Sequence, residues 1–155
     1  MYFANLKVLL AQVIAYSLGL IMSPRLLLLS NSTQSGTKYL EIWKAAITSF
    51  LKESKVTNIT FIPFAGVTID WDSYTKKVRD QLTDFTVKGI HEYDNMTKAI
   101  ADAEALVIGG GNTFHLLFTL QKEGLIDPIR SKVLSGTPYV GWSAGSNVAT
   151  PDIGT

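Results

Sequence analysis

The chain has 155 residues, of which 46% are hydrophobic and 17% charged, and its formal net charge is +1. This composition fits one globular domain with a substantial core and excludes a disordered chain. Because there is no basic block and no basic-aromatic stripe, we expect neither nucleic acid nor an anionic membrane surface as a partner. The absence of cysteine excludes disulfides and thiolate catalysis, and two histidines far apart in sequence argue against a zinc site. We therefore expect no metal and no cofactor.

An almost wholly apolar run, Val8–Ile21, stands near the start of the chain. It is too short for a comfortable membrane span and is closer in length to a signal-peptide core, although Ala15-Tyr16-Ser17 is a poor cleavage site. Met22 immediately precedes the first clear strand. We predict that residues 1–21 are an appended extension, that the domain occupies residues 22–155, and that the protein is cytoplasmic. A functioning signal or anchor and a packed helix are the alternatives.

Beyond Met22, short apolar runs alternate with amphipathic segments. Strands are predicted at Leu26–Leu29, Ile59–Phe64, Thr86–His91, Ala105–Ile108 and Tyr139–Val140. The first is continuously apolar, as expected for a strand buried on both faces, and the third is less apolar and fits a position nearer an edge. Helical spacing of apolar residues predicts helices within Tyr39–Leu51, Tyr74–Phe85, Met96–Ala103, Phe114–Phe118 and Leu125–Val133.

Caps and core positions follow from the same pattern. Asp72 and Asp94 are predicted N-caps of the second and third helices, and Gly136 is a predicted stop after the last. We expect the aromatic residues Trp43, Tyr74 and Phe118 to lie on apolar helix faces in the core.

Alternation of strands and helices predicts an α/β fold, a doubly wound and mostly parallel sheet with helices on both faces. In such a sheet the working residues gather at the carboxyl ends of the strands. The loops that fall there are Ser30–Thr33, Ala65–Trp71, Gly109–Thr113 and the turn at Ser143.

The most informative segment is Gly141-Trp142-Ser143-Ala144-Gly145, which follows a predicted strand and precedes a helix-compatible stretch. This is the pattern of a nucleophile elbow, in which a sharp turn exposes a serine hydroxyl. Ser143 is the candidate nucleophile, and the N–H of Ala144 is a candidate donor to an oxyanion. The loop Gly109–Asn112 could supply a second donor; a phosphate cradle and a plain turn are the alternatives, although the Walker and dinucleotide patterns are absent.

A general base is harder to find. His91 ends a predicted strand and His115 follows the glycine loop, and for each a solvated or capping role competes with that of base. Asp70 and Asp72 could meet a substrate, but solvated and helix-capping roles are the stronger interpretation.

Four segments together resemble the S51 family of serine peptidases, the aspartyl dipeptidases. They are Leu26–Thr33, Phe61–Thr68 with Trp71-Asp72, Gly109–Leu117 and Tyr139–Asn147. The resemblance implies a fold related to class I glutamine amidotransferases and cleavage of dipeptides with N-terminal aspartate without a cofactor. It also implies that Ser143 is the nucleophile and that the N–H groups of Gly111 and Ala144 form the oxyanion hole. Substrate contacts are then expected at Gly110, Asn112 and Thr113.

The resemblance also implies a catalytic histidine and its acidic partner beyond the nucleophile, whereas this sequence ends at Thr155 and neither histidine corresponds to that base. We therefore expect residues 22–155 to be the N-terminal part of an S51 peptidase domain, incomplete at its C-terminal side, with an exposed sheet edge, apolar surface and impaired turnover. The alternatives are a non-catalytic binding or regulatory module, whose exposed sheet edge pairs with a full-length subunit or another partner, and a serine hydrolase resembling cyanophycinase. A homo-oligomer is a further candidate assembly.

Overall fold

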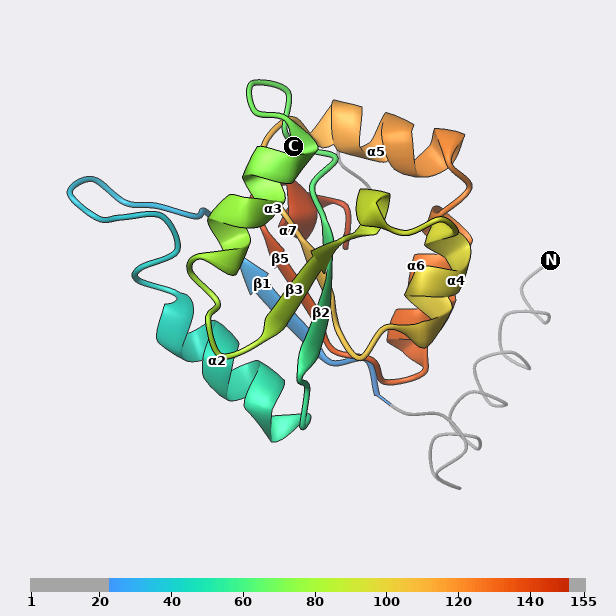
Figure 1. The fold of residues 1–155 in the computed structure, drawn as a ribbon, viewed down its shortest axis with the longest axis horizontal. Helices are drawn as coiled ribbons and strands as arrows, with labels where there is room; N and C mark the ends of the chain where they lie inside the picture. Colours follow the sequence, from blue (N-terminus) through green and yellow to red (C-terminus); the bar gives the residue numbers. More distant parts are fainter. Residues whose placement is uncertain (1–22, 151–155) are drawn as a thin grey trace, which may run out of the picture.

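A computed structural model describes residues 23–150, so the predicted extension at residues 1–21 lies outside the described residues. The described chain folds around a five-stranded, all-parallel sheet with strand order β1-β5-β4-β2-β3 (Figure 1). The strands are β1 (Leu26–Leu29), β2 (Asn58–Ile62), β3 (Thr86–Gly89), β4 (Leu106–Ile108) and β5 (Tyr139–Trp142). The predicted parallel α/β architecture is confirmed.

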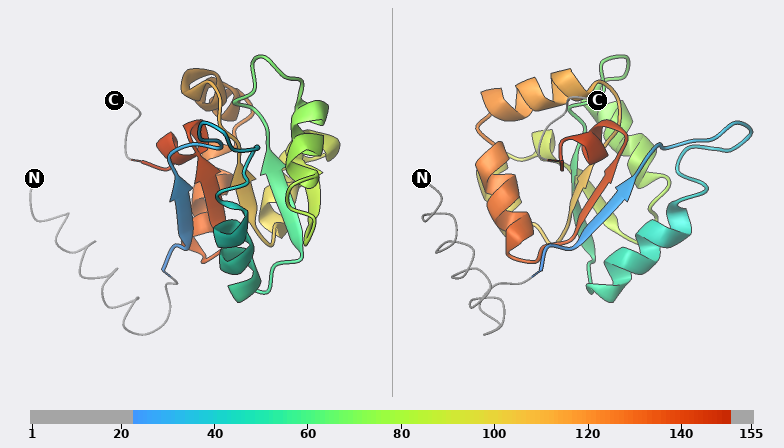
Figure 2. Two further views of the ribbon diagram at one scale, coloured as in Figure 1. Left: turned by 90° about the vertical axis from the view of Figure 1, so that its left-hand side faces the viewer. Right: turned by 180° about the vertical axis from the view of Figure 1, so that it is seen from behind.

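Helices cover both faces of this sheet (Figure 2). They are α2 (Lys44–Glu53), α3 (Trp71–Arg79), α4 (Met96–Asp102), α5 (Thr113–Lys122), α6 (Ile126–Leu134) and α7 (Ala144–Asn147), with a 3-10 turn, η1 (Ile90–Glu92). The buried side chains of α2 and α3 belong to one core, and those of α4, α5 and α6 belong to the other.

The central strands are buried on both sides and divide their side chains between the two cores. In β4, Val107 belongs to the core under α2 and α3, whereas Leu106 and Ile108 belong to the opposite core. This alternation follows from the two-residue side-chain period of a strand. It explains why the central strands contain few polar residues.

The first strand departs from its prediction. β1 pairs with β5 alone and forms one edge of the described sheet, and Leu26 and Leu28 are 43% and 41% exposed. The prediction that Leu26–Leu29 is buried on both faces is therefore wrong, because an apolar run does not distinguish a covered strand from an uncovered one. The exposed edge and apolar surface that were expected are present here. β3 lies at the opposite edge, as predicted.

Two predicted caps are displaced. Asp70, not Asp72, caps α3, since its carboxylate accepts the Ser73 amide at 2.7 Å, a bond that lowers the pKa of Asp70. Asn95, not Asp94, caps α4 by accepting the Lys98 amide at 2.9 Å. In both cases several polar residues precede the helix, and the N-cap is the one whose oxygen reaches an amide three residues ahead.

Some observed element boundaries differ from the predicted ones. β2 ends at Ile62 before Phe64, and β3 ends at Gly89, so His91 lies in η1. Phe118 is 64% exposed on the outer side of α5, which corrects its placement in the core. The buried positions of that helix are Leu116, Thr119 and Leu120, and the short apolar pattern used for the prediction did not establish which side faces inward. Gly136 follows α6 with φ +94°, as predicted.

Within residues 23–150, no helix combines the length and the apolar character needed to cross a lipid bilayer.

Candidate active site

Ser143 occupies the corner between β5 and α7 and has φ 52° and ψ −116°. A positive φ is costly for a residue with a Cβ, by about 1–3 kcal/mol, and persists only where the surroundings enforce it. The geometry is that of a nucleophile elbow. Within the described residues, the Ser143 hydroxyl makes no hydrogen bond, whereas its backbone amide donates to the Leu29 carbonyl at 2.9 Å.

The glycines on each side of Ser143 are required by close packing. A Cβ on Gly141 would lie 2.4 Å from the Gly145 carbonyl oxygen, and a Cβ on Gly145 would lie 2.2 Å from the Ile108 carbonyl oxygen. Both contacts are with backbone, which cannot move aside cheaply. Strand β5, strand β4 and helix α7 can therefore meet at this corner only with glycine at these two positions.

Two side chains that the sequence analysis did not select hold α7 in place. The Ser146 hydroxyl lies 2.7 Å from the Leu29 carbonyl oxygen and 2.8 Å from that of Gly141. The buried Tyr139 hydroxyl donates to the Gly145 carbonyl at 2.5 Å, and burial raises the pKa of Tyr139, so the phenol stays protonated. The sequence offered two signals for these roles: Tyr139 is a polar side chain within an apolar strand, and Ser146 follows the elbow by about one helical turn.

The glycine loop after β4 packs directly against the elbow. A Cβ on Gly110 would lie 2.9 Å from the Cβ of Ser143, and a Cβ on Gly111, which has φ +143°, would lie 2.1 Å from the Ala65 carbonyl oxygen. The backbone N–H groups of Gly111 and Ala144 donate no hydrogen bond within the described part of the chain. Among residues 23–150, two amides and a hydroxyl without hydrogen-bond partners therefore lie on Ser143 and the segments that adjoin it.

Tyr74 links α3 to the glycine loop. Its hydroxyl donates to the Gly110 carbonyl at 2.9 Å and lies 3.3 Å from the Trp142 indole nitrogen, which donates to it. Burial raises the pKa of Tyr74. Tyr74 is in the core, as predicted, but the sequence pattern did not reveal that it also fixes the loop beside Ser143.

The side chains of Asn112 and Thr113 contribute to local structure at the start of α5. Asn112 caps the helix by accepting the His115 amide at 2.9 Å, and Thr113 accepts from the Asn147 side-chain amide at 3.1 Å. Their predicted substrate contacts, like that of Gly110, stay predictions. The structure places all three residues at the carboxyl end of β4, beside the elbow.

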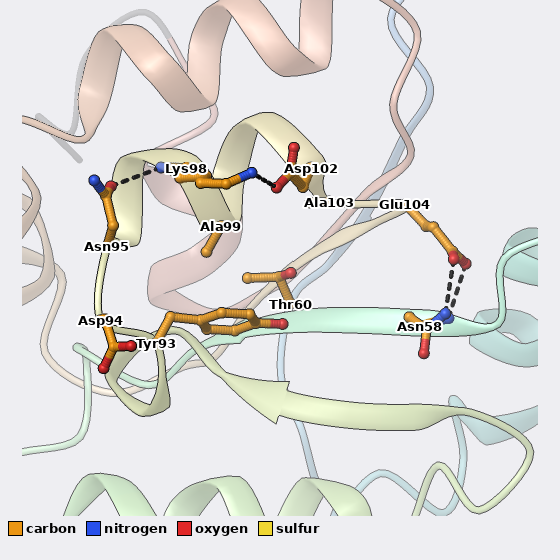
Figure 3. Close-up of a pocket in the computed structure, with 10 residues that line it drawn as sticks. All are labelled: Asn58, Thr60, Tyr93, Asp94, Asn95, Lys98, Ala99, Asp102, Ala103 and Glu104. Atoms are coloured by element: carbon orange, nitrogen blue, oxygen red, sulfur yellow. Dashed lines mark hydrogen bonds and ion pairs between the residues drawn. The ribbon is translucent and has the colours of Figure 1, made fainter.

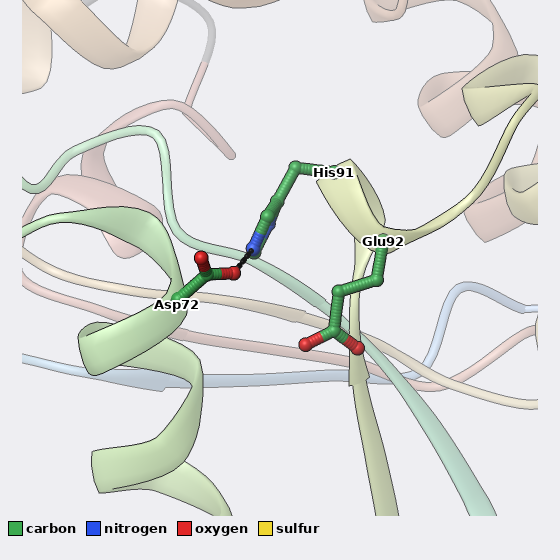
Figure 4. A group of neighbouring side chains, drawn as sticks. All are labelled: Asp72, His91 and Glu92. Atoms are coloured by element: carbon green, nitrogen blue, oxygen red, sulfur yellow. Dashed lines mark hydrogen bonds and ion pairs between the residues drawn. The ribbon is translucent and has the colours of Figure 1, made fainter.

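Within residues 23–150, neither histidine side chain forms a hydrogen bond with Ser143. His91 follows β3, and β2 and β4 separate β3 from β5, so three strand spacings of about 4.8 Å each, roughly 14 Å in all, lie between the two strands. The His91 ring nitrogen Nε2 contacts the Asp72 carboxylate at 2.9 Å (Figure 4). His115 is exposed on the first turn of α5 and its imidazole makes no hydrogen bond within residues 23–150.

Asp72, His91 and Glu92 lie together, with one ligand atom of each within 4.8 Å of the others. Carboxylate oxygens and an imidazole nitrogen are chemically suited to a cation. Glu92 already contacts Arg79 at 3.3 Å and accepts the Gly89 amide at 3.2 Å, and Asp72 is largely exposed. The cluster is therefore a set of surface contacts at the end of β3, made of the Arg79–Glu92 ion pair and the His91–Asp72 contact.

A surface hollow lies between α4 and β2 (Figure 3). Three of its charged residues already have partners: Lys98 contacts Asp102 at 2.5 Å, and Glu104 accepts from the side chain of Asn58 at 2.7 Å. Hydrogen bonds from the Thr57 and Asn58 backbone and from the Asn58 side chain lower the pKa of Glu104 to about 2. Residues with these local roles, far from the elbow, give no reason to place the chemistry here.

Fold and site together define an α/β protein with a serine on a strand-to-helix elbow and free backbone amides beside it, the arrangement of serine hydrolases. The model of peptidase family S51 matches residues 26–155, and the chain belongs to this family.

Relatives of known name agree with this assignment. Peptidase E of Nostoc sp. is 52% identical over 136 residues, covering 86% of this chain and 56% of that protein. Peptidase E of Shewanella amazonensis is 44% identical over 136 residues, and the match covers 86% of this chain and 57% of that protein. The chain thus spans little more than half the length of these relatives.

Solved structures match at the level of the fold. A Listeria monocytogenes protein described as a candidate peptidase E superposes with a TM-score of 0.66 at 24% identity, over 83% of this chain and 63% of that one. A peptidase from an actinobacterium superposes with a TM-score of 0.62 at 20% identity, and the match covers 77% of this chain and 54% of that one.

Proposed function

We propose that the chain carries the nucleophile and oxyanion hole of a serine peptidase. In this proposal the Ser143 hydroxyl attacks a peptide carbonyl, and the N–H groups of Gly111 and Ala144 stabilise the oxyanion that develops. The observation that carries it is the elbow itself: Ser143 has a strained backbone, and within residues 23–150 its hydroxyl and the amides of Gly111 and Ala144 have no hydrogen-bond partner. Donors preorganised in this way are among the largest contributions to acyl-transfer catalysis.

The proposed substrate is a dipeptide with N-terminal aspartate. The four motifs that resemble those of the aspartyl dipeptidases support it, and the relatives that the chain matches are named peptidases. The proposed chemistry needs no cofactor, and a cytoplasmic location stays a prediction.

We expect turnover by this chain alone to be impaired, because within residues 23–150 neither His91 nor His115 is hydrogen-bonded to the Ser143 hydroxyl, and His91 lies three strands away. In serine peptidases, loss of either the nucleophile or its base removes nearly as much activity as loss of both. Replacing Ser143 with alanine should therefore leave the residual hydrolysis of aspartyl p-nitroanilide almost unchanged. The folded chain and its Ser143→Ala variant are compared at equal concentration; rapid, Ser143-dependent release of nitroaniline would refute the impairment and would require an unrecognised base.

Association with a longer S51 peptidase is the second candidate function. The uncovered edge of β1 favours it, since an edge strand offers unpaired N–H and C=O groups to a further strand. Beside this edge lies a groove of about 530 Å³ lined mainly by apolar side chains, among them Leu26, Leu117 and Leu134. The relatives are longer than this chain, so a family member has additional polypeptide that could cover such a surface.

Light scattering after size exclusion tests this association. The chain mixed with full-length Nostoc peptidase E should elute at the summed mass of the two proteins. Leu28→Lys, on the exposed edge of β1, should abolish the complex, while Phe114→Lys, an exposed apolar residue outside the groove, should preserve it. Separate elution of the unaltered proteins across salt and concentration would count against this function.

A further inference from the structure

One face of β1 is uncovered within residues 23–150. Leu27 and Leu29 pack into the core under α2 and α3. Because successive side chains of a strand alternate between its faces, Leu26 and Leu28 point to the other face, where they are 43% and 41% exposed. Leu26 lines the groove of about 530 Å³, whose other walls come from α5, α6 and the residues after α7. Exposed apolar surface of this kind marks a place where another segment packs.

The chemistry of the groove favours an apolar occupant. Among the described residues, Arg130 is the only charged one that lines it, and its guanidinium contacts the Asp127 carboxylate at 3.7 Å. Leu134, at the end of α6, also lines the groove and is 50% exposed. Covering such side chains removes apolar surface from water, which is the main favourable contribution to association. A suitable occupant therefore has many apolar side chains and few charges.

The sequence of this chain contains a segment with that composition. Val8–Ile21 has no charged residue. Leu10, Ile14 and Leu18 are spaced four residues apart, so in a helix of about four turns they would form one apolar face, with Gln12 on the other side. An amphipathic pattern of this kind is typical of a helix that packs into an apolar groove.

The connection between this segment and the groove is short. Ile21 precedes Pro24 by three residues, and Pro24 itself lines the groove. Because an extended chain spans at most about 3.6 Å per residue, the end of the segment is within roughly 11 Å of Pro24. A tether of this length gives a high effective concentration at the groove. Residues 151–155 follow Thr150, which also lines the groove, but they include Asp152 and a single large apolar side chain, so they match it less well.

We propose that residues 8–21 bind in this groove of their own chain and cover the exposed apolar face of β1 and α6. The proposal goes beyond the proposed functions, because it requires neither chemistry at Ser143 nor a longer peptidase. It also gives the segment a regulatory effect on the second of them: a peptidase that associates through this face must first displace residues 8–21.

Cross-linking between introduced cysteines tests the proposal, since the chain has no cysteine of its own. Ser17→Cys is combined with Leu134→Cys in the groove or, as the matched control, with Glu53→Cys. Glu53 contacts Arg25 at 3.8 Å, so it is also beside the start of β1, but it belongs to α2 on the other face of the sheet. With a short bismaleimide, we expect the intrachain cross-link to Leu134→Cys to form about tenfold faster than that to Glu53→Cys, because binding raises the effective concentration at the groove.

Two further variants test whether the apolar face of the segment makes the contact. Ile14→Asp should remove the preference for Leu134→Cys, and Gln12→Asp should preserve it. Equal cross-linking rates at the two positions, or a preference that Ile14→Asp leaves unchanged in a folded chain, would overturn the proposal. Cross-links between chains that increase with protein concentration would also overturn it and would identify a second copy as the occupant. None of these results depends on hydrolysis or on association with Nostoc peptidase E, so both proposed functions are tested separately.

Discussion

Replacing Gly111 with alanine should lower the imidazole-assisted hydrolysis of aspartyl p-nitroanilide about a hundredfold, the usual loss when one oxyanion donor is removed. Imidazole is added because it can diffuse to Ser143 and accept the proton that no histidine of this chain is placed to accept. The new Cβ would lie 2.1 Å from the Ala65 carbonyl oxygen at a backbone φ of +143°. The loop must therefore shift, and the Gly111 N–H moves with it.

Gly124→Ala is the matched control for this prediction. Gly124 also has a positive φ, +66°, but a Cβ there has no heavy atom within 4 Å. The control should cost about 1 kcal/mol of stability through backbone strain while leaving hydrolysis within twofold. Circular dichroism establishes that both variants are folded. A folded Gly111→Ala variant with undiminished hydrolysis would exclude the Gly111 amide from the oxyanion hole.

The architecture could be predicted because its determinants are local. Four of the five strands read as short, mainly apolar runs, and β3, which is less apolar, lies at an edge. Each connection contains an amphipathic helix, and a parallel sheet with two covered faces accommodates this alternation. The elbow could also be predicted, since steric demands at Gly141 and Gly145 leave glycine as the residue that fits.

Features that depend on neighbours distant in sequence could not be predicted in the same way. The exposure of Leu28 follows from the position of β1 at the sheet edge, and an apolar run does not encode strand order. Tyr74 fixes the glycine loop through a contact 36 residues away, although its spacing on α3 indicates only a core residue. Helix caps shifted by one or two residues because Asp, Asn and Ser all favour that position.

The sequence did not decide the role of the histidines either, because that role also depends on the order of the strands in the sheet. His91 comes at the end of a strand, where active residues of parallel sheets gather, yet the strand order places β3 far from β5. Its partner is Asp72, a pairing that resembles half of a catalytic triad but lies at the wrong edge of the sheet. The residue type alone does not distinguish a catalytic histidine from one that contacts a carboxylate away from the active site.

The central claim is that Ser143 is a nucleophile whose base is not supplied by either histidine of this chain. The most direct test measures nitroaniline release from aspartyl p-nitroanilide over a series of imidazole concentrations, for the unaltered chain, Ser143→Ala and Ser135→Ala. Ser135 is an exposed serine at the end of α6 whose hydroxyl donates to the Lys132 carbonyl, and it serves as the matched control. The unaltered chain and Ser135→Ala should show a rate that rises with imidazole and saturates, whereas Ser143→Ala should show none. The same imidazole-dependent rate in all three proteins would contradict the assignment of Ser143.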